Sequence, residues 1–447
     1  MDKKITKELI EFIKASPTSF HAINTITTQL QEAGYEELSE ANLWQLRCGG
    51  KYYVTRNHSS IIAFHVGTDL HDYSFHIAAS HSDSPTFKVK ENAQLEMQGK
   101  YTRLNTEGYG GMLCAAWLDR PLSLAGRVIV KEGNSFVTRL VKIDRDLVLI
   151  PNVAIHLNRD VNQGYAYNKQ VDMLPLLGGS ETGKNDYKHC IAKELKVKPE
   201  DICGMDIYLY NRNEPSVWGA HEEFVSAPRL DDLQCAFATL QGFLKGFHPQ
   251  TIQVFACFDN EEVGSRTKQG ADSTFLYDTL YRINQALGME EEAYHKALAL
   301  GFMVSADNAQ AVHPNHPELT DVNNCVYMNE GIVIKSHAQQ SYASDALSLA
   351  LFKEICERTQ VPVQFFANRS DKMSGGTLGN ISQSHVSINT VEVGIAQLAM
   401  HSCYETAGVK DTEYLIKAMK QFYSTYFHQI DATHVEMITK EDNEMDS

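Results

Sequence analysis

Residues 251–262 have the sequence TIQVFACFDNEE, an almost unbroken apolar run that ends directly in acidic and amide side chains. A continuous apolar strand is typical of the middle of a sheet that is covered on both faces. Shorter runs at 74–79 and 301–305 are also followed by His or Asp residues. Because open α/β sheets bind ligands at the carboxyl ends of their strands, we expect an α/β fold with a functional site there.

The remaining periodicity predicts how this sheet is covered. Apolar residues at helical spacing predict helices at 3–15, 17–33, 233–244, 273–287, 341–358 and 411–428, the last with Phe422 and Tyr426 on its apolar face. Between 92 and 225, short alternating strands and breaks rich in glycine and asparagine replace this pattern. We therefore expect one domain built from 1–91 and 226–447 around an inserted β-rich domain at 92–225.

The composition excludes several classes of protein. The chain has 447 residues with 40 Lys and Arg against 56 Asp and Glu, so its formal net charge is −16. A nucleic-acid-binding protein needs a basic surface, and no apolar run here approaches the roughly 18–20 residues of a membrane helix. The chain starts without a signal-peptide core, and its nine cysteines form no Cys-x-x-Cys pair. We expect a cytoplasmic protein with reduced cysteines and with neither nucleic-acid nor membrane partners.

Two histidines and several carboxylates stand at the ends of the predicted elements. They are His81, Asp231, the pair Glu261 and Glu262, Asp307, and His401. Each residue alone has an ordinary structural explanation, but so many at element ends together predict a metal site. Two imidazoles with three carboxylates suit a zinc-like ion better than calcium or magnesium.

The residue types also indicate how such a site would act. Three carboxylates offset most of the charge of two divalent ions, and the two oxygens of one carboxylate can bridge them. A water between two such ions ionises near neutral pH and becomes a nucleophile. Asp83 is placed to accept the second imidazole N–H of His81. If the backbone is extended at Glu261 and Glu262, their side chains diverge, so one binds metal and its neighbour serves as general base.

Six short sequence motifs resemble those of a known family. They are HSDSP at 81–85, SAPRLD at 226–231, DNEEVGS at 259–265, VSAD at 304–307, AVHPN at 311–315 and QLAMHS at 397–402. With these motifs in this order, the chain resembles the aspartyl aminopeptidase and aminopeptidase I family of dinuclear zinc metallopeptidases from end to end. The resemblance implies a mixed sheet of the zinc-exopeptidase type, flanked by helices, with 92–225 as an inserted dimerisation domain.

The resemblance also implies the metal ligands. One zinc ion would be bound by His81 and Glu262. The second would be bound by Asp307 and His401, with Asp231 bridging the two ions of each subunit. In such a site, Glu261 would be the base that activates the bridging water, and Asp83 would orient His81.

Three further residues match substrate-binding positions of that family. His156, in the inserted domain, would reach into the active site of a neighbouring subunit, and Lys335 would contact the substrate. Gln310 stands where relatives usually have a substrate-contacting histidine. The sequence of the glycine-rich segment 368–380 also differs from the one that family members usually have there. Both departures bear on the preferred N-terminal residue, because a pocket for acidic side chains needs well-placed donors or positive charge.

The expected function is removal of the N-terminal residue from peptides, with a preference for acidic residues. The resemblance implies a homo-oligomer that is built from dimers and reaches a dodecamer. Two alternatives stay open from the residues. The same ligands could serve a zinc-dependent N-acyl amino acid deacylase or carboxypeptidase, or the chain could be a non-catalytic peptide-binding scaffold. Cleavage of a free-amine peptide but not of its N-acetylated form would distinguish the aminopeptidase from the deacylase.

Overall fold

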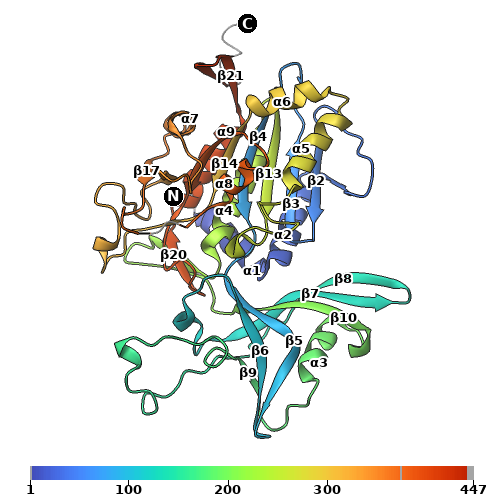
Figure 1. The fold of residues 1–447 in the computed structure, drawn as a ribbon, viewed down its shortest axis with the longest axis vertical. Helices are drawn as coiled ribbons and strands as arrows, with labels where there is room; N and C mark the ends of the chain where they lie inside the picture. The colour runs from blue at the N-terminus through green and yellow to red at the C-terminus, as the bar shows by residue number, and fades with distance from the viewer. Residues whose placement is uncertain (1–2, 373–374, 440–447) are drawn as a thin grey trace.

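The computed structural model describes residues 3–372 and 375–439. In this part of the chain the largest sheet, called the large sheet below, has nine strands (Figure 1). In spatial order they are β1 (Glu36–Leu38), β2 (Lys51–Arg56), β3 (Ser60–His65), β13 (Thr251–Phe258), β4 (Ser74–His81), β14 (Phe302–Ala306), β18 (Asn389–Gly394), β16 (Ile332–Lys335) and β17 (Val363–Phe366). The central strands β13, β4, β14 and β18 run parallel, so their carboxyl ends share one edge.

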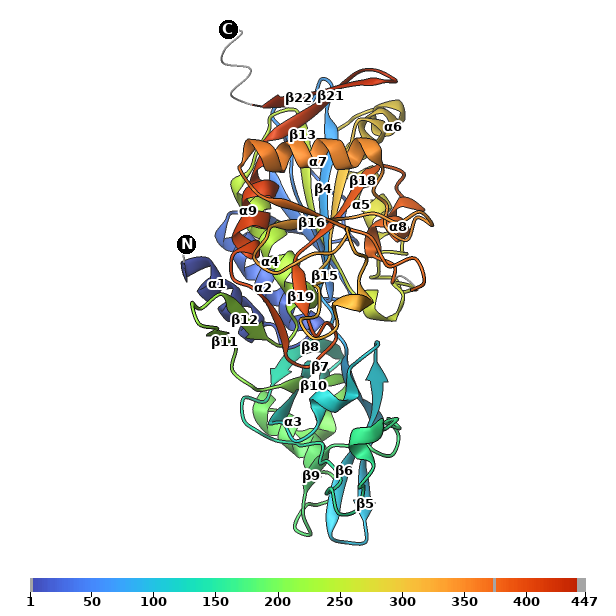
Figure 2. The ribbon, with the colours of Figure 1, turned by 90° about the vertical axis from the view of Figure 1, so that its left-hand side faces the viewer.

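Helices cover both faces of the large sheet (Figure 2). One face packs against α1 (Lys3–Ala15), α2 (Ser19–Glu32), α4 (Leu230–Lys245), α7 (Ala346–Arg358) and α9 (Asp411–Tyr423), and the other against α5 (Phe275–Ala286), α6 (Glu291–Ala299) and α8 (Leu378–Gln383). Along β13, Phe255 and Cys257 enter the first core, whereas Val254 and Phe258 enter the second. Every residue of β13 is buried, which confirms the prediction of a strand covered on both faces.

A second unit, called the lobe, lies below the large sheet in Figure 1. Its sheet contains β8 (Ser135–Lys142), β7 (Leu122–Glu132), β10 (Ile202–Asn211), β5 (Thr86–Met97), β6 (Tyr101–Tyr109) and β9 (Leu176–Gly178), in this spatial order, with α3 (Asp186–Leu195) packed on it. This sheet begins at Thr86 and ends at Asn211, whereas the predicted insertion was 92–225. The division of the chain into domains stays a prediction.

A small sheet brings together segments that lie next to three predicted ligands. It contains β11 (Ser216–Trp218), β12 (Phe224–Ala227), β20 (Glu405–Gly408), β19 (Ala396–Leu398) and β15 (Ala309–Gln310), in this spatial order. Strand β12 shortly precedes Asp231, β15 follows Asp307, and β19 shortly precedes His401. The small sheet therefore holds residues far apart in the sequence beside the edge of the large sheet.

The predicted helix at 411–428 is too long. Helix α9 ends at Tyr423, and Thr425–Asp431 forms β21, which pairs with β22 (His434–Thr439). Tyr426 is thus buried from a strand rather than from the helix face. The run from Thr425 to Phe427 is β-branched and aromatic, and such residues favour strands when a pairing partner is present. Within the described ranges, every helix is too short or too polar to span a bilayer.

Candidate metal centre

Two predicted ligands, His81 and Asp307, end neighbouring strands of the large sheet. His81 is the last residue of β4, and Asp307 directly follows β14. Because β4 and β14 are paired in parallel, both side chains reach the same edge. His81 Nε2 lies 4.0 Å from Asp307 Oδ1. We call this pair the strand side of the site.

Glu262 and His401 form what we call the loop side. Glu262 lies in the short 3-10 helix η4 (Glu261–Val263) after β13, and His401 lies in the turn after β19. His401 Nε2 is 3.2 Å from Glu262 Oε2. The backbone at Glu261 and Glu262 is 3-10 helical, so the extended backbone on which the predicted divergence of their side chains depended is not observed.

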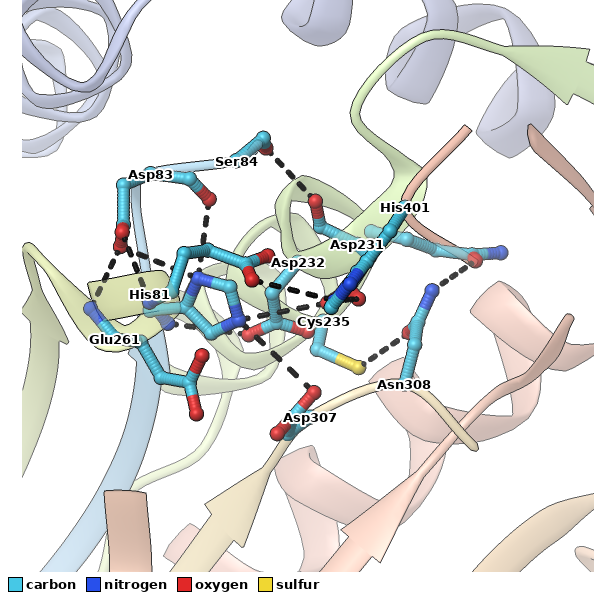
Figure 3. A network of polar contacts seen from close by, with 12 residues as sticks. His81, Asp83, Ser84, Asp231, Asp232, Cys235, Glu261, Asp307, Asn308 and His401 are labelled. Carbon is cyan, nitrogen blue, oxygen red and sulfur yellow. Dashed lines mark hydrogen bonds and ion pairs between the residues drawn. The ribbon is translucent and has the colours of Figure 1, made fainter. Parts of the chain in front are cut away.

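Asp231 lies between the two sides, at the start of α4 (Figure 3). Its Oδ1 atom is 3.4 Å from His81 Nε2, and its Oδ2 atom is 3.5 Å from His401 Nε2. Each oxygen of one carboxylate thus faces a different histidine. The ion-pair contacts join His81 with Asp307 and His401 with Glu262. Ligand atoms of His81, Glu261 and Glu262 also lie within 4.8 Å of one another, so the expected pairing of His81 with Glu262 and of Asp307 with His401 stays a prediction.

Asp83 connects the site to three other segments. Its backbone and side-chain oxygens lie 3.1 Å and 3.4 Å from His81 Nδ1. Its carboxylate also accepts the backbone N–H groups of Glu261 and Glu262, both at 3.2 Å, and the hydroxyl of Tyr109 at 2.6 Å. Tyr109 comes from β6 of the lobe. Asp83 is thus placed to orient His81 and, in addition, to hold the turn that carries both glutamates.

The donor atoms fit a divalent cation. Asp231 Oδ1, Asp232 Oδ1 and Glu262 Oε1 are buried and accept no hydrogen bond from any described residue. Buried carboxylate oxygens are normally satisfied, and a metal ion would supply the missing partner. Three sets of residues have single ligand atoms within 4.8 Å of one another: Asp231, Glu262 and His401; His81, Asp231, Asp232 and Asp307; and His81, Glu261 and Glu262.

The acidic side chains of the site repel one another. Burial raises the pKa of Glu261 to about 8; the negative charges of Asp307 and Asp83 add to this rise and His81 opposes it. Burial also raises the pKa values of Glu262 and Asp307. Cations favour the ionised form of nearby acids, so bound metal would relieve the repulsion that these groups create in the protein alone.

The three predicted substrate residues differ in their distance from this site. Lys335, at the end of β16, is buried; its Nζ donates to the Asn308 carbonyl at 2.8 Å and lies 4.0 Å from Asp307 Oδ2. Gln310 is exposed on β15, and His156 is exposed in the lobe. In the described part of the chain, no hydrogen bond or ion pair joins either of these two side chains to the ligands. Met373 and Ser374 of the irregular segment 368–380 lie outside the described residues.

Sequence reasoning missed three residues that support the predicted ligands. The Asp232 carboxylate accepts the backbone N–H of His81 at 3.1 Å. Tyr109 binds Asp83 as described above, and Glu405 accepts backbone N–H groups of two ligand residues. Asp232 could have been found as the neighbour of Asp231. Nothing in the local pattern around Tyr109 or Glu405 indicates their role, because it arises from contacts across the sequence.

Comparisons with known proteins identify the family of the chain. Residues 12–423 match the family described as aminopeptidase I zinc metalloprotease (M18). A probable M18 family aminopeptidase 2 of Clostridium novyi is 46% identical over 427 residues, which cover 94% of this chain and 99% of that protein.

Two solved structures are similar over the same length. One, from a cryo-EM structure of an Ape4 and Nbr1 complex, has a TM-score of 0.91 and 35% identity, covering 94% of this chain and 85% of that chain. The other, from an S. cerevisiae mApe1 dodecamer, has a TM-score of 0.82 and 27% identity, covering 94% and 96%. With the buried cluster of His and acidic residues, these matches establish that the chain belongs to the M18 family and is a zinc aminopeptidase.

Proposed function

We propose that the chain removes N-terminal residues from peptides with a pair of zinc ions that share Asp231. One observation carries this proposal: the two oxygens of Asp231 face His81 and His401 separately, at 3.4 Å and 3.5 Å. His81 also makes an ion-pair contact with Asp307, and His401 makes one with Glu262. One ion would therefore be bound on the strand side and the other on the loop side, with Asp231 bridging them.

The remaining residues suggest how hydrolysis proceeds. When bound, a zinc pair polarises the scissile carbonyl and lowers the pKa of a water molecule. Glu261 lies beside the ligands but makes no ion pair with either histidine in the described chain, so its carboxylate is available to accept the water proton. Glu261 then returns this proton to the leaving amine. Asp83 keeps Glu261 in place through the backbone N–H of that residue.

Substitution of the adjacent glutamates tests this assignment. Glu261→Gln should lower kcat by roughly 10²-fold or more, because general-base catalysis contributes about 10²–10⁴-fold, while the zinc content stays that of the wild type. Glu262→Gln is the matched control and should lose zinc. Unchanged turnover of Glu261→Gln would remove Glu261 from its role, and cleavage of only N-acetylated peptides would contradict the aminopeptidase reaction itself.

A preference for acidic N-terminal residues is supported by Lys335. Burial alone lowers its pKa, but Asp307 and other neighbours raise the pKa above the ordinary value, so the ammonium stays charged. Part of this charge is balanced by Asp307, which leaves a modest attraction for a substrate carboxylate. Lys335→Met should therefore reduce kcat/KM for aspartyl substrates more than for leucyl substrates. An equal reduction for both would contradict the preference.

We further propose that the protein is a homo-oligomer in which His156 reaches the active site of a neighbouring subunit. The similar mApe1 chain comes from a structure described as a dodecamer. In this chain His156 is exposed, as such a role requires. Mixing inactive His156→Ala and Glu261→Gln subunits under exchange conditions should restore activity, since some sites then receive both residues. A monomer in light scattering would contradict the proposal.

A further inference from the structure

Glu405 joins the two turns that carry Asp231 and His401. It is the first residue of β20 and lies opposite Ala227 of β12 in the antiparallel ladder. Its side chain is 2% exposed. Glu405 Oε2 accepts the backbone N–H of Asp231 at 3.0 Å, and Oε1 accepts that of His401 at 2.8 Å. One carboxylate thus fixes the separation of two ligand residues that are far apart in the sequence.

Both turns need such support. His401 has a φ of 66° and Arg229, just before the ligand Asp231, has a φ of 60°. Residues with a side chain rarely adopt this left-handed region, and they do so only where the surrounding structure holds them. A carboxyl group with two acceptor oxygens can bind the backbone N–H groups of both turns at once and so hold them together.

We infer that Glu405 is a positioning residue for the zinc ion on the loop side. Glu405 would set the distance between Asp231 and His401, an assignment that rests on the proposed zinc pair. The strand side depends on Glu405 less, because His81 and Asp307 are fixed by paired strands. Loss of the Glu405 carboxylate should therefore weaken one zinc ion more than the other.

A matched control exists elsewhere in the chain. Asp411 is also a buried carboxylate that accepts two backbone N–H groups, from Asn329 at 2.6 Å and from Gly331 at 3.1 Å. It makes no hydrogen bond or ion pair with a predicted ligand among the described residues. Asp411→Asn therefore reproduces the loss of a buried, doubly bonded carboxylate without altering the two turns at the metal centre.

The experiment is a zinc titration of full-length protein against a chromophoric chelator. His401→Ala identifies which of the two wild-type steps belongs to the loop side. In Glu405→Gln, the loop-side zinc should bind at least about 10-fold more weakly, and the strand-side zinc should change less, because partners that orient ligands typically contribute 10–100-fold to metal affinity. Asp411→Asn should stay within about twofold of the wild type for both ions.

Each outcome has a defined meaning. A wild type with fewer than two zinc ions would contradict the proposed ion pair. Two normal ions in Glu405→Gln, equal weakening of both, or the same weakening in Asp411→Asn would overturn the role of Glu405 alone. Thermal unfolding of the metal-free variants checks that they fold. If Glu405→Gln does not fold, Glu405→Asp replaces it, since the shorter side chain keeps the charge but cannot reach both N–H groups.

Discussion

The strand side and the loop side of the metal centre are built differently. His81 is 1% exposed and ends a central strand, whereas His401 is 34% exposed and lies in a turn with left-handed backbone. Asp307 directly follows a strand, and Glu262 lies in a single 3-10 turn. The strand side is positioned by paired strands of the large sheet, with Asp232 and Asp83 as additional partners of His81. The loop side depends on individual carboxylates, Asp83 and Glu405, that bind the backbone of its turns.

The largest expected effect comes from the residue that both sides share. Asp231→Asn replaces one anionic oxygen by an amide group, so neither of the two proposed zinc ions would keep its full ligand set. This variant should bind less than one zinc ion per chain and lose roughly 10³-fold or more in kcat/KM, since metal ions contribute several kcal/mol to transition-state stabilisation. Asp307→Asn is the comparison and should keep the loop-side zinc. Metal analysis with two bound ions in Asp231→Asn would contradict the bridge.

A second prediction concerns two histidines of the same strand. His81 points among carboxylates, whereas His76 of β4 is stacked between Phe422 and Phe427 at ring-centroid distances of 5.2 and 5.1 Å. Burial lowers the pKa of His76 from its ordinary 6.5 to about 3. As the pH falls, His76 therefore binds a proton in the unfolded chain before it does so in the folded protein. The free energy of unfolding decreases as the pH drops below 6.5.

The expected loss at His76 is about 2 kcal/mol between pH 7 and pH 5, or a factor of about 30 in the unfolding equilibrium. Over this pH range, the free energy of unfolding of His76→Phe should therefore decrease by about 2 kcal/mol less than that of the wild type. Urea unfolding of both proteins at several pH values measures this difference. Parallel pH profiles for the two proteins would show that His76 does not make this contribution. Activity at pH 7 should stay unchanged, because His76 lies away from the ligands.

The third prediction compares the two zinc ions proposed for the wild type. Because the strand side is preorganised by paired strands, its zinc should bind roughly 10-fold more tightly than the loop-side zinc, in the range that ligand orientation contributes. Stepwise chelation should first yield a one-zinc species that resembles His401→Ala. If that species resembles His81→Ala instead, the loop side is the tighter one and the comparison is reversed.

The smallest expected effect tests the contribution of the lobe. Tyr109→Phe removes the hydroxyl that donates to Asp83 at 2.6 Å and accepts from Asn260 at 2.8 Å. A hydrogen bond contributes about 1 kcal/mol, so kcat/KM should fall by about fivefold. Tyr208, whose ring is 5.9 Å from that of Tyr109, provides the control, and Tyr208→Phe should stay within about twofold. Equal losses in both variants would indicate a packing effect.

Sequence analysis placed His81 and Asp307 at the carboxyl ends of predicted strands, although it paired His81 with Glu262 and Asp307 with His401. The apolar runs before His81 and Asp307 form paired parallel strands, so adjacent carboxyl ends follow from the pattern itself. The pairing of His401 with Glu262 does not follow, because it depends on a turn and a 3-10 helix set by long-range contacts. For the same reason Glu405 gave no signal, and Tyr426 was assigned to a helix although a hairpin partner draws it into β21.

Anomalous diffraction at the zinc absorption edge tests the central claim most directly. Crystals of the zinc-loaded protein should show two peaks per chain on either side of the Asp231 carboxylate. One peak should lie between His81 and Asp307, and the other between His401 and Glu262. A single peak, or two peaks that do not share Asp231, would contradict the account.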